Sequence, residues 1–108
     1  MIRDISDHSR EIAALCEKYR VVRLEVFGSA ARGGFDAATS DIDLIAEFAS
    51  TREPGYADRY MDFADALEAL LGYKVDLLTP PSIRNRHFAE NIKRDAILIY
   101  DATNPQAA

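Results

Sequence analysis

Two short stretches decide the fold of this chain, VFGSAARG at residues 26–33 and SDIDLI at residues 40–45. In the first stretch, an apolar strand ends in a turn of small residues that begins with Gly28 and Ser29. In the second stretch, Asp41 and Asp43 open another strand. Because side chains alternate along a strand, these two carboxylates point the same way, roughly 6.5 to 7 Å apart along the backbone.

Working outward from these stretches, alternation of apolar and polar residues predicts strands over residues 21–27, 41–48 and 74–78, with a last strand over 96–100. Helical spacing predicts one helix over residues 6–20, capped by Ser6 or Asp7. A second helix follows the break at residues 53–55 and ends at Leu71, with Gly72 as its cap. A third helix is expected to start near Ser82.

The strands share one regularity that predicts the architecture. One face of the sheet is expected to be apolar, with Val22, Leu24 and Val26 from the first strand, Ile42, Leu44, Ala46 and Phe48 from the second, and Val75 and Leu77 from the third. The opposite face carries charged side chains, among them Arg23, Glu25, Asp43 and Asp76. This pattern predicts an α/β (α+β) domain in which helices cover one face of a small sheet and the other face is wet.

Length and composition limit the partners that the chain can have. Its 108 residues predict one domain over residues 1–102, followed by a loose tail over 103–108. Thirteen basic and eighteen acidic residues give a net charge of −5, so direct binding to nucleic acid is not expected. No apolar stretch reaches the ~20 residues of a membrane span, so no membrane partner is expected either. The single Cys16 fits a reducing compartment, and we expect a cytoplasmic location.

The acids on the polar face favour metal chemistry. Asp41, Asp43 and Asp76 together supply enough oxygen ligands for two divalent cations, and these ligands favour Mg²⁺ or Mn²⁺ over zinc. In this interpretation, Asp76 ligates the second ion or accepts a proton from an attacking hydroxyl. Two simpler interpretations stay open: Asp41 and Asp43 are exposed acids on an edge strand, and Asp76 is a solvated acid paired with Lys74.

The turn after the first strand has the chemistry of a phosphate site. Gly28 lets the backbone approach an anion closely, and the Ser29 hydroxyl can donate a hydrogen bond to a phosphate oxygen. Arg32 lies a few residues further on and can pair with a leaving pyrophosphate. An ordinary turn is the alternative for the Gly-Ser pair on its own.

These motifs resemble those of the minimal nucleotidyltransferases in the DNA polymerase β superfamily. The resemblance rests on residues 26–33, 40–44, 75–78 and 91–100 and covers about four fifths of the chain. The spacer from Ala30 to Ser40 has eleven residues, one more than the family pattern. The resemblance implies a mixed sheet with helices on one face, ATP as substrate and two Mg²⁺ ions. Asp41 and Asp43 would bridge metal and triphosphate, Asp76 would serve the nucleophile, and Gly28 and Ser29 would hold phosphate.

The resemblance also implies a partner. Free-standing members of this size resemble antitoxins that transfer AMP from ATP to a tyrosine of a HEPN-domain toxin, and a chain this small would need a partner to supply the acceptor. The sequence therefore predicts a protein adenylyltransferase that acts on a HEPN toxin. Two alternatives remain: a non-catalytic antitoxin that neutralises its partner by binding, and a small-molecule nucleotidyltransferase that needs a dimer to complete its pocket.

Overall fold

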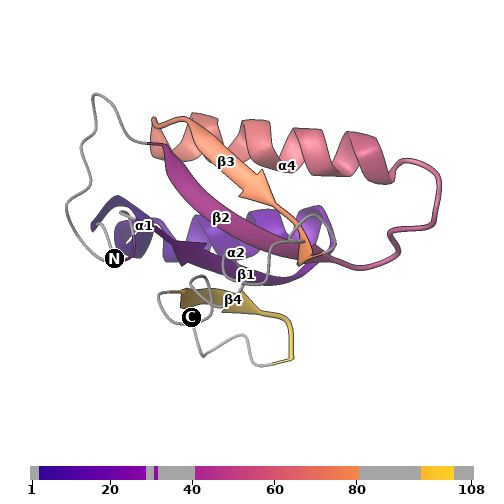
Figure 1. Cartoon of the computed structure of the whole chain (residues 1–108), viewed down its shortest axis with the longest axis horizontal. Helices are drawn as coiled ribbons and strands as arrows, with labels where there is room; N and C mark the ends of the chain where they lie inside the picture. Colours follow the sequence, from indigo (N-terminus) through magenta and orange to yellow (C-terminus); the bar gives the residue numbers. More distant parts are fainter. Residues whose placement is uncertain (1–2, 29–30, 32–40, 81–95, 104–108) are drawn as a thin grey trace.

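In the part of the chain that the structure describes, three helices lie behind a sheet of four strands (Figure 1). The computed structural model describes residues 3–28, 31, 41–80 and 96–103. In chain order these residues form α1 (Arg3–Asp7), α2 (Ser9–Lys18), β1 (Val21–Phe27), β2 (Ile42–Phe48), α4 (Tyr56–Leu71), β3 (Val75–Leu78) and β4 (Ile97–Asp101). The predicted helix near Ser82 lies outside the described residues.

The sheet is mixed, as expected. Its strand order is β3-β2-β1-β4. β1 pairs antiparallel with both β2 and β4, whereas β2 and β3 run parallel. The chain enters β3 from α4, a crossover connection of the kind that parallel neighbours require. One consequence matters for the site: the end of β1, the start of β2 and the start of β3 meet at the same end of the sheet.

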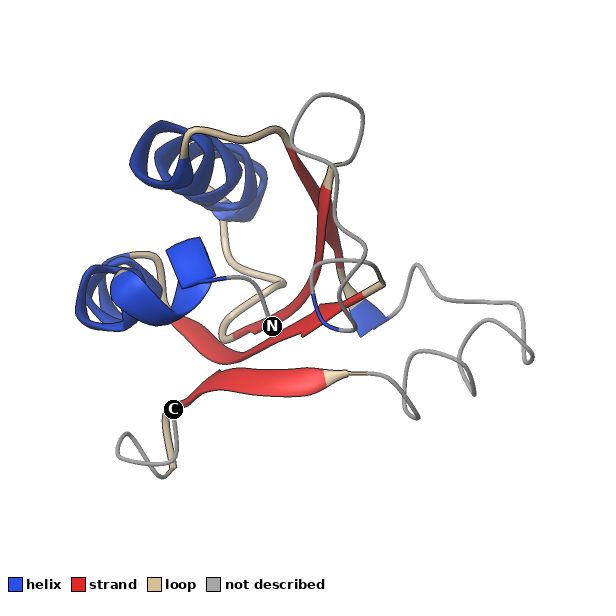
Figure 2. Ribbon diagram, turned by 90° about the vertical axis from the view of Figure 1, so that its left-hand side faces the viewer, coloured by secondary structure: helices blue, strands red, loops and turns tan. Residues whose placement is uncertain are grey.

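The helices cover one face of the sheet, which confirms the predicted layering (Figure 2). Four apolar residues of β2 face this layer and are at most 7% exposed, namely Ile42, Leu44, Ala46 and Phe48. Ile45 points to the opposite face and is half-buried. The partners of the four buried residues in the core include Ile12 and Cys16 of α2 and Phe63 and Leu67 of α4. The rings of Phe48 and Phe63 pack edge to face with centroids 5.7 Å apart. Burial of this apolar surface is what holds the helices to the sheet.

Helix α4 follows its predicted pattern closely. Phe63 and Leu67 are fully buried, while Asp58 and Asp62 on the opposite side are exposed. Gly72 ends the helix in the left-handed conformation, at φ 77°, and its N–H bonds the carbonyl of Glu68. The predicted C-cap is therefore confirmed. Among the described residues, none of the helices has both the length and the apolar character to cross a bilayer.

The single helix predicted over residues 6–20 is wrong, because the chain breaks at His8. The segment starts earlier, at Arg3, and His8 is the residue that precedes α2, with no side-chain capping bond. The His8 ring bonds the carbonyl of Asp4 at 2.8 Å, which ends α1 locally. The two-helix arrangement still buries Ile5, which is 1% exposed.

The predicted inward position of Val22 is also wrong. Val21 is 2% exposed and joins the core, whereas Val22 is only half-buried. The cause is a register shift between Val21 and Arg23 where β1 pairs with β2. Such a bulge inserts a residue and reverses the alternation before it. From Leu24 onward the predicted faces hold.

Candidate functional site

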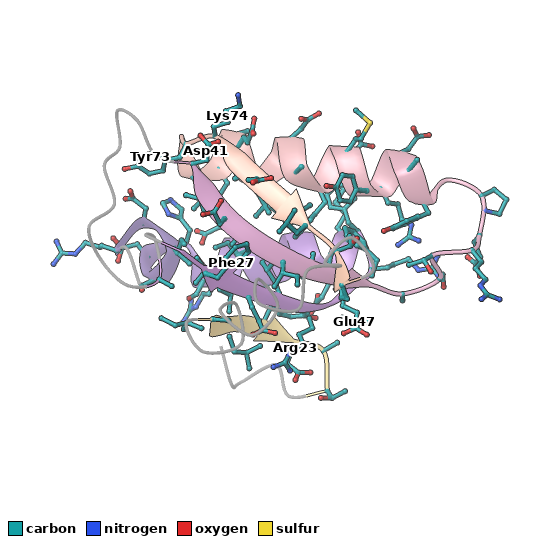
Figure 3. All side chains as sticks on the ribbon, viewed as in Figure 1. Arg23, Phe27, Asp41, Glu47, Tyr73 and Lys74 are labelled. Carbon is teal, nitrogen blue, oxygen red and sulfur yellow. The ribbon has the colours of Figure 1, made fainter. Side chains whose placement is uncertain are left out.

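Three predicted acids come together at one end of the open face. In the β2–β3 pair, Asp43 lies directly beside Asp76, and in the β1–β2 pair it lies beside Phe27. Paired residues of neighbouring strands project to the same face, and the strands are about 4.8 Å apart. Asp41 lies two residues before Asp43 and therefore projects in the same direction. Figure 3 shows Asp41 beside Tyr73 and Lys74, at the start of β2 and β3.

The carboxylates are close enough to perturb one another. Burial raises the pKa of Asp43 above its ordinary value, and the nearby charges of Asp76 and Asp41 raise it further. Asp43 is half-buried, while Asp41 and Asp76 are exposed. Folding therefore holds like charges together, a cost that a bound cation would relieve.

Gly28 is fitted against the central acid of this group. Its φ is 70°, in the left-handed region, and its carbonyl accepts a hydrogen bond from the N–H of Ala31 at 3.1 Å. A Cβ built on Gly28 would lie 2.5 Å from Oδ2 of Asp43, closer than real side chains approach. Both the backbone angle and the space therefore require glycine, and the predicted turn does begin there. No sequence pattern indicates the close approach of Gly28 to Asp43.

The other two predicted phosphate ligands, Ser29 and Arg32, lie outside the described residues. Their roles stay predictions. The structure shows where their segment begins: directly after Gly28, at the end of the sheet that carries Asp43.

The donor set suits a hard divalent cation that arrives with its substrate. Within the described parts of the chain, no three His, Cys, Asp or Glu side chains form a ready-made metal cage. Mg²⁺ does not need one, because it commonly takes one or two carboxylates together with substrate phosphates and water. Asp43 and Asp76, neighbours in register and mutually repelling, fit that role, with Asp41 beside them.

The acids at the opposite end of the open face have a different environment. Arg23 bonds Glu25 at 2.8 Å and Asp101 at 3.2 Å, which ties β1 to β4. Hydrogen bonds from Thr103, and to a lesser extent Arg23, lower the pKa of Asp101, whereas the pKa of Asp43 is raised. This network stabilises the sheet, and sequence reasoning missed the part played by Asp101. The pKa of Asp101 is lowered and that of Asp43 is raised, so the two ends of the open face differ in their electrostatic environment.

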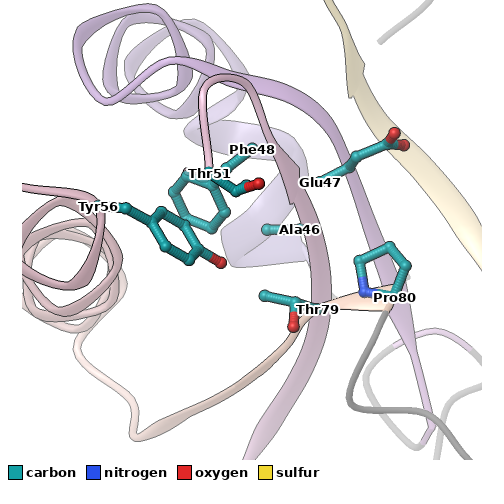
Figure 4. Close-up of a pocket in the computed structure, with 7 residues that line it drawn as sticks. All are labelled: Ala46, Glu47, Phe48, Thr51, Tyr56, Thr79 and Pro80. Atoms are coloured by element: carbon teal, nitrogen blue, oxygen red, sulfur yellow. The ribbon is translucent and has the colours of Figure 1, made fainter. Parts of the chain in front are cut away.

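A cavity of about 530 Å³ lies beyond the ends of β2 and β3, and sequence reasoning did not find it (Figure 4). It is lined by Ala46, Glu47, Phe48, Thr51, Tyr56, Thr79 and Pro80. Ala46 is the lining residue of β2 nearest to Asp43 along the strand, three residues or roughly 10 Å away, and it faces the helices rather than the open face. The cavity is therefore separate from the group of acids.

Comparison with known proteins identifies the family. The model of the nucleotidyltransferase domain matches residues 9–99. A relative from Methanocaldococcus jannaschii, named "Putative protein adenylyltransferase", is 39% identical over 85 residues, which are 79% of this chain and 83% of the relative. A solved structure called a "putative minimal nucleotidyltransferase" superposes with a TM-score of 0.70 at 32% identity, covering 85% of this chain and 89% of the other.

The same fold occurs in a solved complex of a tri-AMPylated HEPN toxin from Shewanella oneidensis with an MNT antitoxin. The TM-score is 0.61 and the coverage is 94% of this chain and 76% of the other, at 17% identity. At that identity the likeness shows a shared fold. Together with the matched domain and the relatives above, the mixed sheet with its predicted acids confirms the family that the motifs indicated. The chain belongs to the nucleotidyltransferase domain family and is a minimal nucleotidyltransferase.

Proposed function

We propose that this protein transfers AMP from magnesium-bound ATP to a tyrosine hydroxyl of a HEPN-type toxin and so acts as the antitoxin of that toxin. The observation that carries the proposal is the register of β2 and β3, which places Asp43 beside Asp76 next to the turn at Gly28. The adenylyl group is supported by the name of the 39% identical relative. The toxin partner is supported by the complex that shares the fold.

The nucleotide fits the end of the sheet that carries Gly28. In the proposal, Asp41 and Asp43 hold the Mg²⁺-bound triphosphate, and the turn with Gly28, Ser29 and Arg32 receives its phosphates. The raised pKa of Asp43 supports this arrangement, because a group of acids with no cation is electrostatically unfavourable. When bound, Mg²⁺ supplies positive charge against the triphosphate and the carboxylates; a second ion is part of the same proposal.

The exposure of Asp76 suits an acceptor that arrives from another protein. The tyrosine oxygen forms a bond to the α-phosphorus of ATP, and the bond from that phosphorus to the β-phosphate bridging oxygen breaks. Pyrophosphate leaves, and Asp76 takes the phenolic proton. Asp76 is exposed on the open face, so a tyrosine on a docked surface can reach it.

Intact-mass spectrometry of the protein that the neighbouring gene encodes tests the proposal. After incubation with the protein and MgATP, the neighbour should gain the mass of one or more AMP groups, and peptide mapping should place them on tyrosine. Asp41→Asn and Asp43→Asn should each abolish the gain and leave the fold intact. If the wild-type protein binds and neutralises its neighbour without adding mass, and the double variant Asp41→Asn plus Asp43→Asn neutralises it equally well, the protein acts by binding and the proposal is wrong.

A further inference from the structure

Strand β3, which carries Asp76, lies at the edge of the sheet and is only four residues long. Its hydrogen bonds to β2 use the backbone of alternate residues, as the bond from the N–H of Ile42 to the carbonyl of Lys74 shows. The backbone groups of Val75 and Leu77 therefore face away from β2. A short strand bonded on one side alone would hold its side chains loosely.

Two side chains of α4 bond this outer edge, one on each side of Asp76. The carboxylate of Glu68 accepts a hydrogen bond from the N–H of Val75 at 2.9 Å. The hydroxyl of Tyr60 donates a hydrogen bond to the carbonyl of Leu77. Residues 75 and 77 are thus tied to the helix while residue 76 pairs with β2.

We propose that Tyr60 and Glu68 are positioning residues that fix Asp76 beside Asp43 through the backbone of β3. Neither side chain reaches the reacting atoms in this account. Their hydrogen bonds to the Val75 N–H and the Leu77 carbonyl hold the backbone on both sides of Asp76 and so fix where its carboxylate lies on the open face. This inference rests on the proposed function, in which Asp76 serves the acceptor hydroxyl. A displacement of about 1 Å at such a position can cost on the order of 100-fold in rate.

The helix offers a matched control for Tyr60. Tyr56 lies one turn earlier, and both rings pack on Phe48, with centroids 5.5 Å and 6.0 Å from it. Tyr60→Phe and Tyr56→Phe each remove one hydroxyl and keep the ring. Of the two hydroxyls, that of Tyr60 donates a hydrogen bond to β3, and that of Tyr56 makes no such bond to the described residues of β3. Tyr60→Phe should therefore lower kcat for AMP transfer about tenfold with KM for ATP unchanged, and Tyr56→Phe should match the wild-type protein.

Glu68 allows a test by rescue. Glu68→Leu removes the acceptor for the Val75 N–H and should lower kcat about tenfold, whereas Glu68→Gln keeps an accepting oxygen and should restore it. Amide hydrogen exchange gives a readout without nucleotide or partner: the Val75 amide should exchange about tenfold faster in Glu68→Leu than in the wild-type protein, and Glu68→Gln should restore slow exchange.

The outcomes separate this inference from the proposed function. A wild-type protein that transfers no AMP contradicts the proposed function. In that case, the exchange rate of the Val75 amide in Glu68→Leu and Glu68→Gln still tests whether the side chain of Glu68 on α4 stabilises β3. In an active protein, the positioning role is overturned if Tyr60→Phe keeps the kcat of Tyr56→Phe. It is also overturned if Glu68→Leu and Glu68→Gln lose kcat equally, since that result would indicate a role of the charge itself.

Discussion

Replacing Gly28 by alanine tests the geometry of the site at its tightest point. Two costs follow from the structure. At φ 70° an alanine sits in the left-handed region, which costs roughly 1 to 2 kcal/mol. Its Cβ would also lie 2.5 Å from Oδ2 of Asp43, where ordinary contact begins at 3.4 Å, so the carboxylate must retreat by 3.4 − 2.5 = 0.9 Å. A displacement of that size at a reacting group corresponds to about a 100-fold loss of kcat.

Gly72 provides the control that separates these two costs. Its φ is 77°, and a Cβ there would meet nothing within 4 Å. Gly72→Ala should therefore show the backbone cost alone, with a loss of roughly 1 to 2 kcal/mol in unfolding free energy and an unchanged kcat. Gly28→Ala should show a similar loss of stability and the 100-fold loss of kcat in addition.

The assay pairs urea denaturation of both variants with steady-state AMP transfer at saturating MgATP and partner. Equal stability losses with a large difference in kcat are the expected result. If kcat of Gly28→Ala stays within about twofold of kcat of Gly72→Ala, the contact between Gly28 and Asp43 has no bearing on the reaction, and that outcome would refute the reasoning.

Three further predictions concern other parts of the molecule. Folding raises the pKa of Asp43 above its ordinary value of 3.8, so the protonated carboxyl favours the folded state. This contribution to the unfolding free energy is complete below pH 3.8 and is lost as the pH rises through the pKa that Asp43 has in the folded protein. In metal-free buffer Asp43→Asn should thus have a higher urea midpoint than the wild-type protein at pH 7, with the gap closing below pH 3.8; equal midpoints at pH 7 would contradict this. Phe63→Ala removes a fully buried ring that packs on Tyr19 and Phe48 and should cost about 3 to 5 kcal/mol in urea denaturation, whereas a loss below about 1 kcal/mol would show that the core is assigned wrongly. Burial, and to a lesser extent Glu17, raises the pKa of Cys16 to about 12, so a thiol-specific reagent at pH 8 should label it only in unfolded protein, and rapid labelling of the native protein would argue against that burial.

The sequence could predict the strands and α4 because their residues obey simple periods. Alternation in residues 42–48 gives the core face of β2 directly, and the stripe that includes Phe63 and Leu67 gives the buried side of α4. The same alternation puts Asp43 and Asp76 on the polar face. Their placement side by side depends on the register of β2 and β3, which the crossover through α4 sets and which no local pattern encodes.

The errors in the sequence predictions have local causes. The break at His8 depends on a ring-to-backbone bond to Asp4 that competes with helix formation. The bulge at the start of β1 puts Val21 in the core in place of Val22. Because both residues are valine, the sequence does not indicate which of them is buried. Gly28 was predicted from phosphate chemistry alone, whereas the structure adds a steric reason that comes from a residue 15 positions away, Asp43. Contacts of this kind exist only after the strands have paired.

A crystal structure with Mn²⁺ and a non-hydrolysable ATP analogue tests the central claim most directly. The account predicts that the triphosphate lies at the turn that begins with Gly28, with anomalous density for manganese at ligand distance from the carboxylates of Asp41 and Asp43. A nucleotide seated instead in the cavity lined by Phe48 and Tyr56, with no metal at those two carboxylates, would contradict it.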